Sequence, residues 1–225
     1  MSWTREKALS LIREIGLVPI IRTPSAEDAW LAAEVLIEGE VGVAEITMTV
    51  PGAIGVLEKL AGRFSGQIVL GAGTVLDAET ARVCMLSGAE FIVSPSLRAS
   101  VIEIAKRYSK IVTPGALTPT EVLTAWEAGA DAVKIFPCGS VGGAKYIKNL
   151  KGPFPQIEMI PTGGVSLENA GEFLKAGACA IGVGTELVDG KSMAAGKFDV
   201  IEERARQFLA AVAKARTEMR AAAGA

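Results

Sequence analysis

The feature that most constrains the fold is a repeated unit, in which one strand-like run is followed by one helical pattern. In the first unit, the apolar run Leu17-Val18-Pro19-Ile20-Ile21 precedes a helix that is opened by Ser25 and has an acid three residues later. Eight such units, preceded by an extra helix over about residues 4–15, predict a closed (β/α)8 (TIM) barrel. An open doubly wound sheet is the alternative, because a local pattern does not encode closure. The seven later runs lie near residues 43–46, 68–70, 91–93, 111–113, 132–136, 158–160 and 180–183.

Signals for helix ends recur along the chain. Caps are predicted at Asp77, Thr118 and Ser166, and Thr118 also has a proline next to it and an acid three residues later. A glycine also stands just past three of the predicted helices, before the next strand. These glycines are Gly88, Gly129 and Gly177.

Length and composition suit one domain of this class. The 225 residues are 50% hydrophobic, with 25 glycines and only 5% aromatic residues, a mixture typical of strands covered by helices. We predict a single domain over residues 1–225, with the N-terminal helix inside 1–16 and a frayed, alanine-rich tail over 216–225. The net charge of −2 and the dispersed basic residues predict no nucleic-acid partner.

The N-terminus and the cysteines indicate the compartment. The stretch Trp3-Thr4-Arg5-Glu6-Lys7 is charged and does not resemble a signal peptide, and no apolar run is long enough to span a bilayer. Three cysteines at unrelated spacings suggest neither a disulfide framework nor a zinc motif. We therefore predict a cytoplasmic protein with no membrane partner and no metal. Cys138 is interpreted as a buried or half-buried thiol, with a position near a site as the alternative.

The chain contains no histidine, which restricts mechanism. Histidine triads, histidine-based zinc sites and imidazole acid/base steps are excluded. Proton transfer must use a carboxylate, an amine, a hydroxyl, a thiol or water.

Lys134 lies inside an apolar run that otherwise reads as a buried strand. Alternation turns Lys134 and Phe136 into the barrel, and desolvation favours the neutral, nucleophilic amine. On the second strand the same alternation turns Glu45 and Thr47 inward, where the carboxylate could shuttle protons. The alternatives are a lysine that holds an anion, or a structural ion pair between Glu45 and Lys134.

Glycine-rich segments follow the seventh and eighth strands, where barrels commonly bind phosphate through backbone N–H groups. The two segments are Thr162-Gly163-Gly164 and Gly182-Val183-Gly184-Thr185, and tight turns are the alternative reading. Gly71-Ala72-Gly73-Thr74 follows the third strand and is no dinucleotide fingerprint. Thr74 is better placed there as a hydrogen-bond donor in the pocket.

At these residues the chain resembles the 2-keto-3-deoxy-6-phosphogluconate (KDPG) and 4-hydroxy-2-oxoglutarate (KHG) aldolases. The resemblance implies a cofactor-free, metal-free class I aldolase, a homotrimer that cleaves the 2-keto acid phosphate KDPG to pyruvate and glyceraldehyde 3-phosphate. The matching segments are Glu45-Ile46-Thr47, Gly71-Ala72-Gly73-Thr74-Val75-Leu76, Phe91-Ile92-Val93-Ser94-Pro95, Pro114-Gly115, Lys134-Ile135-Phe136-Pro137 and Pro161-Thr162-Gly163-Gly164-Val165.

The resemblance also implies roles for individual residues. Lys134 is the expected Schiff-base lysine and Glu45 the general acid/base. Thr74 and Thr162 are expected to orient the pyruvoyl group. Backbone groups and one hydroxyl are expected to hold the phosphate, at Gly163, Gly164, Gly184 and Thr185. The substrate-binding set is completed by Thr47, Thr49, Pro95 and Phe136.

Thr49 is a departure from the family pattern, because some members have at this position an arginine that binds the substrate carboxylate. We predict that Arg22, at the end of the first strand, supplies the missing guanidinium. Cys138-Gly139-Ser140 is a second departure and leaves the aldehyde-side specificity open. The alternatives are an aldolase for the phosphogalactonate epimer or for KHG, a phosphate-metabolite isomerase or synthase, and a non-enzymatic assembly subunit.

Overall fold

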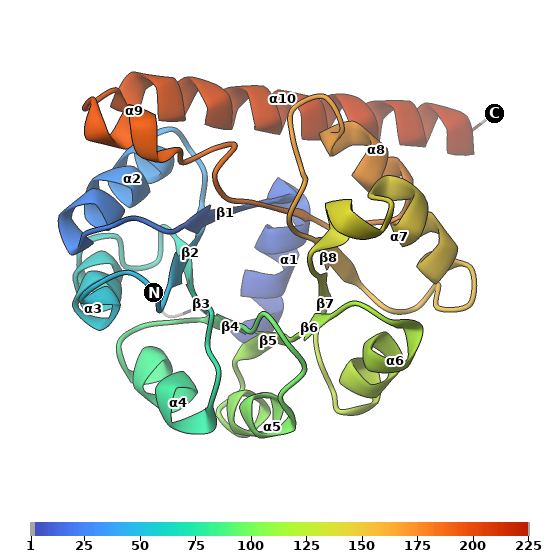
Figure 1. Cartoon of the computed structure of the whole chain (residues 1–225), viewed down its shortest axis with the longest axis horizontal. Coiled ribbons are helices and arrows are strands. Elements are labelled where there is room, and N and C mark those ends of the chain that lie inside the picture. The colour runs from blue at the N-terminus through green and yellow to red at the C-terminus, as the bar shows by residue number, and fades with distance from the viewer. Residues whose placement is uncertain (1–2, 225) are drawn as a thin grey trace.

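A computed structural model describes residues 3–224 and contains two parallel β-sheets surrounded by helices (Figure 1). The larger sheet has six strands in the order β5-β4-β3-β2-β1-β9, and the smaller has the order β6-β7-β8. The strands are β1 (Leu17–Ile21), β2 (Val43–Thr47), β3 (Val69–Gly73), β4 (Phe91–Val93), β5 (Ile111–Thr113), β6 (Gly115–Ala116), β7 (Val133–Ile135), β8 (Met159–Pro161) and β9 (Ile181–Val183).

The larger sheet is curled as a half-barrel. The closed eight-stranded barrel predicted from the sequence is therefore confirmed only in part. β5 pairs with β4, and β6 pairs with β7. Pro114 separates β5 from β6 and has no N–H to donate to a neighbouring strand. A parallel bridge between Thr162 and Gly182 connects the end of β8 to β9.

Helices lie outside the sheets, with the exception of α1, which lies behind the strands in Figure 1. The predicted N-terminal helix is α1, and α10 includes most of the tail that was predicted to fray. Among residues 3–224 there is no helix both long and apolar enough to cross a membrane. The helices are α1 (Arg5–Ile15), α2 (Ala26–Glu38), α3 (Ala53–Arg63), α4 (Ala78–Leu86), α5 (Ala99–Arg107), α6 (Pro119–Glu127), the 3-10 helix η1 (Cys138–Val141), α7 (Ala144–Lys151), α8 (Ala170–Lys175), α9 (Gly190–Ala194) and α10 (Phe198–Ala223).

Three predicted helix caps are confirmed and one is wrong. Ser25, Asp77 and Thr118 each accept a hydrogen bond from the first turn, and Thr118 forms a reciprocal capping box. Ser166 is not the cap of α8, because the helix begins only after Asn169 and the Ser166 hydroxyl donates to the side chain of Glu168. The three glycines past helix ends have positive φ angles, as their position requires: Gly88 (103°), Gly129 (92°) and Gly177 (101°).

The alternating faces of the strands contribute to two separate apolar clusters. One face packs against the surrounding helices, and the other faces inward. The inward cluster contains Val43, Val69 and Phe91, together with Ala8 and Ile12 of α1. Because α1 fills the inward space at the N-terminal ends of the strands, a site has room only at their C-terminal ends.

Candidate functional site

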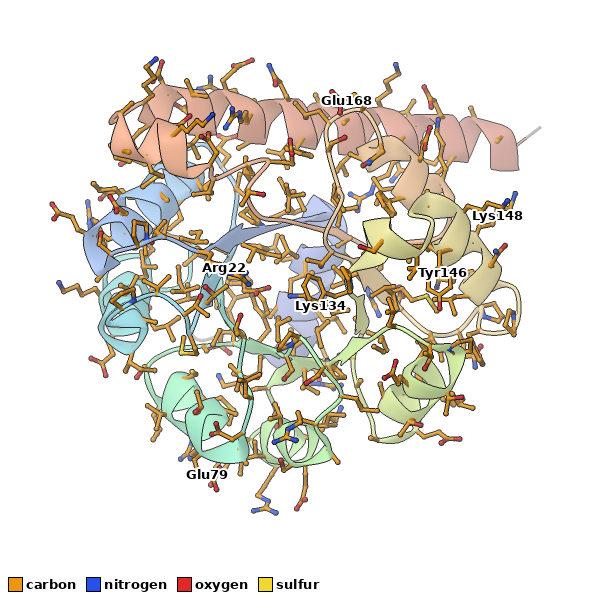
Figure 2. The ribbon with its side chains drawn as sticks, in the orientation of Figure 1. Arg22, Glu79, Lys134, Tyr146, Lys148 and Glu168 are labelled. Carbon is orange, nitrogen blue, oxygen red and sulfur yellow. The ribbon has the colours of Figure 1, made fainter. Side chains whose placement is uncertain are left out.

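Lys134 on β7 and Glu45 on β2 face each other inside the protein, as alternation predicts. The lysine Nζ lies 4.0 Å from Oε1 of Glu45, and the two side chains are only 7% and 3% exposed. Figure 2 shows Lys134 near the centre of the molecule. Glu45 Oε1 has no hydrogen-bond partner in the part of the chain that the structure describes. The pair is therefore close in space but not joined by a direct hydrogen bond.

Burial raises the pKa of the Glu45 carboxyl above its ordinary value, and the positive charges of Lys134 and Arg22 oppose that rise. Gly73 on β3 makes room for this carboxyl, because a Cβ at that position would clash with Oε1 of Glu45. The glycine in the predicted Gly71-Ala72-Gly73-Thr74 segment thus permits the position of the candidate acid/base.

A pocket of about 290 Å³ opens above Lys134, at the C-terminal ends of the strands. Arg22 reaches this pocket from the end of β1, and Figure 2 shows it beside Lys134. Eight residues predicted for the site line it: Arg22, Lys134, Phe136, Thr162, Gly163, Gly164, Gly184 and Thr185. Ile20, Ser166 and Glu186 also line it and were not predicted, as do Val165 and Gly182, which lie in segments named from the sequence but received no role of their own.

The loop after β8 is held against η1 by backbone contacts. The N–H of Gly139 donates to the carbonyl of Gly163 at 2.8 Å, and both Gly163 and Gly164 have φ near 80°. A Cβ at Gly164 would lie 2.8 Å from the Cα of Gly139, so this close approach requires glycine. The pocket wall here exposes backbone, as the predicted phosphate site needs.

Comparison with known proteins decides the family. A family model described as KDPG and KHG aldolase matches residues 9–204. The chain belongs to this family. This aldolase is therefore a lyase.

Two relatives are named for different substrates. The aldolase is 32% identical over 209 residues to a 2-dehydro-3-deoxy-phosphogluconate aldolase of Haemophilus influenzae, with 93% of this chain and 98% of the relative covered. It is 34% identical over 175 residues to a 2-dehydro-3-deoxy-6-phosphogalactonate aldolase of Escherichia coli, with 77% and 85% covered. These names leave the specific substrate undecided.

A solved structure bears on the chemistry of the family. The aldolase is 27% identical to the KDPG aldolase of Legionella pneumophila, whose crystal structure holds pyruvate captured as a covalent carbinolamine intermediate. The two structures superpose with a TM-score of 0.82 over 91% of this chain and 97% of the other.

Four of the predicted substrate-binding residues of the aldolase do not line the pocket. Thr47 donates to the carbonyl of Ile21 at 3.2 Å and shares a 2.8 Å hydrogen bond with Thr49, which is exposed. Thr74 is partly buried and has a φ of 57°, an unusual angle for a β-branched residue. Pro95 approaches Gly115 so closely that a Cβ there would clash with the Pro95 backbone. Their roles in binding stay predictions.

A second cavity of about 20 Å³ lies directly beneath the pocket and shares Lys134, Thr162 and Gly182 with it. Glu45 and Thr113 line this lower cavity. Thr113 was not among the predicted residues, although period-two alternation along Ile111-Val112-Thr113 turns its side chain inward. The strand alternation already used for Glu45 and Lys134 would have found it.

Burial raises the pKa of the Cys138 thiol to about 11. The sulfur points to the carbonyl of Gly143 at 3.6 Å, in agreement with a buried thiol. Among residues 3–224, no group of three or more Cys, Asp or Glu residues could hold a metal ion.

Proposed function

We propose that the aldolase cleaves KDPG to pyruvate and glyceraldehyde 3-phosphate through a Schiff base on Lys134. The observation that carries the proposal is the buried amine of Lys134, which lines an open pocket and lies 4.0 Å from the Glu45 carboxyl. The carbinolamine captured in the Legionella pneumophila relative supports covalent chemistry with a 2-keto acid.

The reaction follows from the two side chains. The Lys134 ammonium passes a proton to the Glu45 carboxylate, and the freed amine attacks the C2 carbonyl and forms a carbinolamine. Glu45, whose raised pKa favours the protonated form, gives a proton to the departing hydroxyl, so that water leaves and an iminium remains. Glu45 then takes the proton of the C4 hydroxyl, and the electrons of the C3–C4 bond flow to the iminium nitrogen. The resulting enamine is protonated at C3 and hydrolysed to pyruvate.

Substrate binding is assigned to the remaining predicted residues. Arg22 binds the carboxylate, because a guanidinium can form two parallel hydrogen bonds with it. Thr162 lies beside Lys134 and orients the pyruvoyl group together with Thr74. The phosphate is held at the backbone of Gly163, Gly164 and Gly184 and by Thr185. Thr47, Thr49, Pro95 and Phe136 complete the substrate-binding set.

Borohydride trapping with pyruvate tests the proposal. We expect reduction to fix one pyruvate per chain, and peptide mass spectrometry to locate the adduct on Lys134. Lys134→Met should abolish trapping, whereas Lys145→Met, which removes a lysine outside the pocket, should leave it intact. Absence of an adduct under conditions that trap a control class I aldolase would refute the mechanism and favour an isomerase or synthase.

The phosphogalactonate epimer is the second candidate substrate, because the Escherichia coli relative named for it is 34% identical. KHG is a third candidate. Comparison of kcat/KM for the three compounds with one enzyme preparation decides among them. We expect KDPG to have the highest value, and a higher value for the epimer would reassign the substrate.

The role of Arg22 is tested through binding. Arg22→Ala should raise KM for KDPG by about tenfold or more, since a bidentate charged contact is lost. Arg206→Ala on α10 is the matched control, because it removes an exposed arginine outside the pocket. Unchanged pyruvate affinity and kcat/KM in Arg22→Ala would show that another group holds the carboxylate.

We also propose a single domain in which the two sheets close into one (β/α)8 barrel, assembled as a cytoplasmic homotrimer. The bridge between Thr162 and Gly182 supports closure on one side, and the trimer rests on the resemblance to the family. Light scattering should give a particle mass three times the 23.4 kDa of the chain.

A further inference from the structure

The floor of the active site contains a buried polar atom and a space beside it. Glu45 Oε1 is buried and has no hydrogen-bond partner among the described residues. The cavity of about 20 Å³ that Glu45 lines is large enough for one water molecule. A buried carboxylate oxygen without a partner is costly, because it loses its hydration without compensation.

The lining of this cavity suits a water molecule. Four polar side chains line it: Glu45, Lys134, Thr113 and Thr162. A buried water commonly makes two to four hydrogen bonds, and polar groups more than about 3.5 Å apart are often bridged by one. The 4.0 Å between Nζ and Oε1 is such a separation. The apolar lining, which includes Ile12 of α1, closes the cavity toward the base of the sheets.

We propose that Thr113 is a positioning residue that binds a resident water beneath the Lys134–Glu45 pair. The water donates to Oε1 of Glu45 and hydrogen-bonds with the Thr113 hydroxyl. Thr113 ends β5 and is only 4% exposed. It thus acts on the carboxyl through the water and does not contact the substrate. This role deepens the proposed function and depends on Glu45 being the acid/base.

The water has a definite effect on the protonation of Glu45. A hydrogen bond to the carboxylate stabilises its charged form and so opposes the effect of burial. The other charged groups that face Glu45 are Lys134 on β7 and Arg22 at the end of β1, while its neighbour on β3 is Gly73. Loss of the Thr113 hydroxyl should therefore leave the carboxyl more easily protonated.

The test compares Thr113→Val, which keeps the shape but removes the hydroxyl, with Thr113→Ser, which keeps the hydroxyl. We expect Thr113→Val to lower kcat/KM about tenfold at neutral pH and to move the acid limb of its pH profile to higher pH. Thr113→Ser should restore the limb. Ser87→Ala is the matched control, because Ser87, at the end of α4, has another buried hydroxyl, which donates to Glu58 of α3. It should leave the pH profile unchanged.

High-resolution crystal structures provide a readout that does not depend on activity. The wild-type crystal should show one water within hydrogen-bond distance of Thr113 Oγ1 and Glu45 Oε1, and the Thr113→Val crystal should lack it. A cavity without water in the wild type, an unchanged acid limb in Thr113→Val, or failure of Thr113→Ser to restore it would each overturn the inference. Failure of pyruvate trapping in the wild type would instead overturn the proposed function. The crystal structures would then still show whether the water is present.

Discussion

Two buried charged side chains lie three residues apart in the sequence, Asp131 just before β7 and Lys134 in the middle of that strand, and their surroundings differ. Asp131, before the strand, is 1% exposed, and its carboxylate pairs with Arg5 of α1 and lies 3.6 Å from Lys106. Its second oxygen accepts the N–H of Val112 at 2.9 Å. Lys134, within the strand, has one carboxylate neighbour among the described residues, Glu45 at 4.0 Å.

The difference separates a structural charge from a reactive one. Both oxygens of Asp131 have partners, and those partners tie α1, β5 and α5 together at the closed base. At the open end, Oε1 of Glu45 has no hydrogen-bond partner among residues 3–224, and a pocket gives access to the lysine. A satisfied buried ion cluster stabilises the fold, whereas an incompletely satisfied pair retains groups that can bind a reactant or move a proton.

The largest effect is expected at Lys134. Lys134→Met should reduce turnover by at least about 10⁴-fold, because no other lysine of the described residues lines the pocket. The free energy of unfolding should change by no more than about 1 kcal/mol, since the substitution removes a desolvated charge and Glu45 can take up a proton. Steady-state kinetics and urea unfolding measure the two quantities.

Lys134→Arg distinguishes a nucleophile from a charge. The guanidinium keeps the positive charge beside Glu45, but it stays protonated and cannot form a Schiff base. We expect it to be as inactive as Lys134→Met. Substantial activity in Lys134→Arg would mean that Lys134 only stabilises charge, which was the structural alternative for this pair.

Asp131→Asn should lower stability and leave activity nearly unchanged, the opposite of Lys134→Met. Removal of the carboxylate leaves Arg5 without its buried partner and should cost about 3 kcal/mol of unfolding free energy. The kcat/KM per folded molecule should stay within about twofold of wild type, because the site at the other end of the strand is unchanged. Glu218→Gln, which breaks an exposed ion pair with Lys175, is the control and should leave the denaturation midpoint nearly unchanged. A large loss of activity in Asp131→Asn would show that the two ends are coupled.

Much of the fold could be predicted from the apolar strand runs and from the residues that begin and end helices. The runs at β1, β4 and β5 match the predicted residues, since continuous apolar segments flanked by caps and glycines are strong local signals. The break at Pro114 could not be predicted, because a local pattern does not encode that β5 pairs with β4 and β6 with β7. The shifted start of α8 could not be predicted either, because it depends on which group the Ser166 hydroxyl contacts. The role of α1 against the inward cluster depends on packing and has no local signal.

Part of the site could be predicted, because alternate side chains along a strand face the same side of the sheet. Glu45, Lys134 and Arg22 converge because parallel strands end at the same edge and alternate residues face inward. Glu186 and Ser166 were missed because loop geometry, which periodicity does not describe, brings them to the pocket. Thr47 and Thr49 do not line the pocket. The hydroxyl of Thr47 donates to the carbonyl of Ile21 on β1 and also shares a hydrogen bond with Thr49.

The smallest expected effect is the pH dependence that Glu45 gives to stability. Burial raises the pKa of its carboxyl in the native state above the ordinary value of 4.5, so between these two values the native protein binds more protons than the unfolded chain. The contribution of Glu45 to stability should therefore fall as pH rises from 4.5 through the native pKa, and then stay constant. Unfolding free energies of the wild type and Glu45→Gln, measured from pH 4.5 to 8, isolate it. We expect Glu45→Gln to gain stability relative to the wild type as pH rises, because the neutral amide carries no desolvated charge. A difference that does not vary with pH would mean that the open end satisfies its carboxylate as well as the closed base satisfies Asp131.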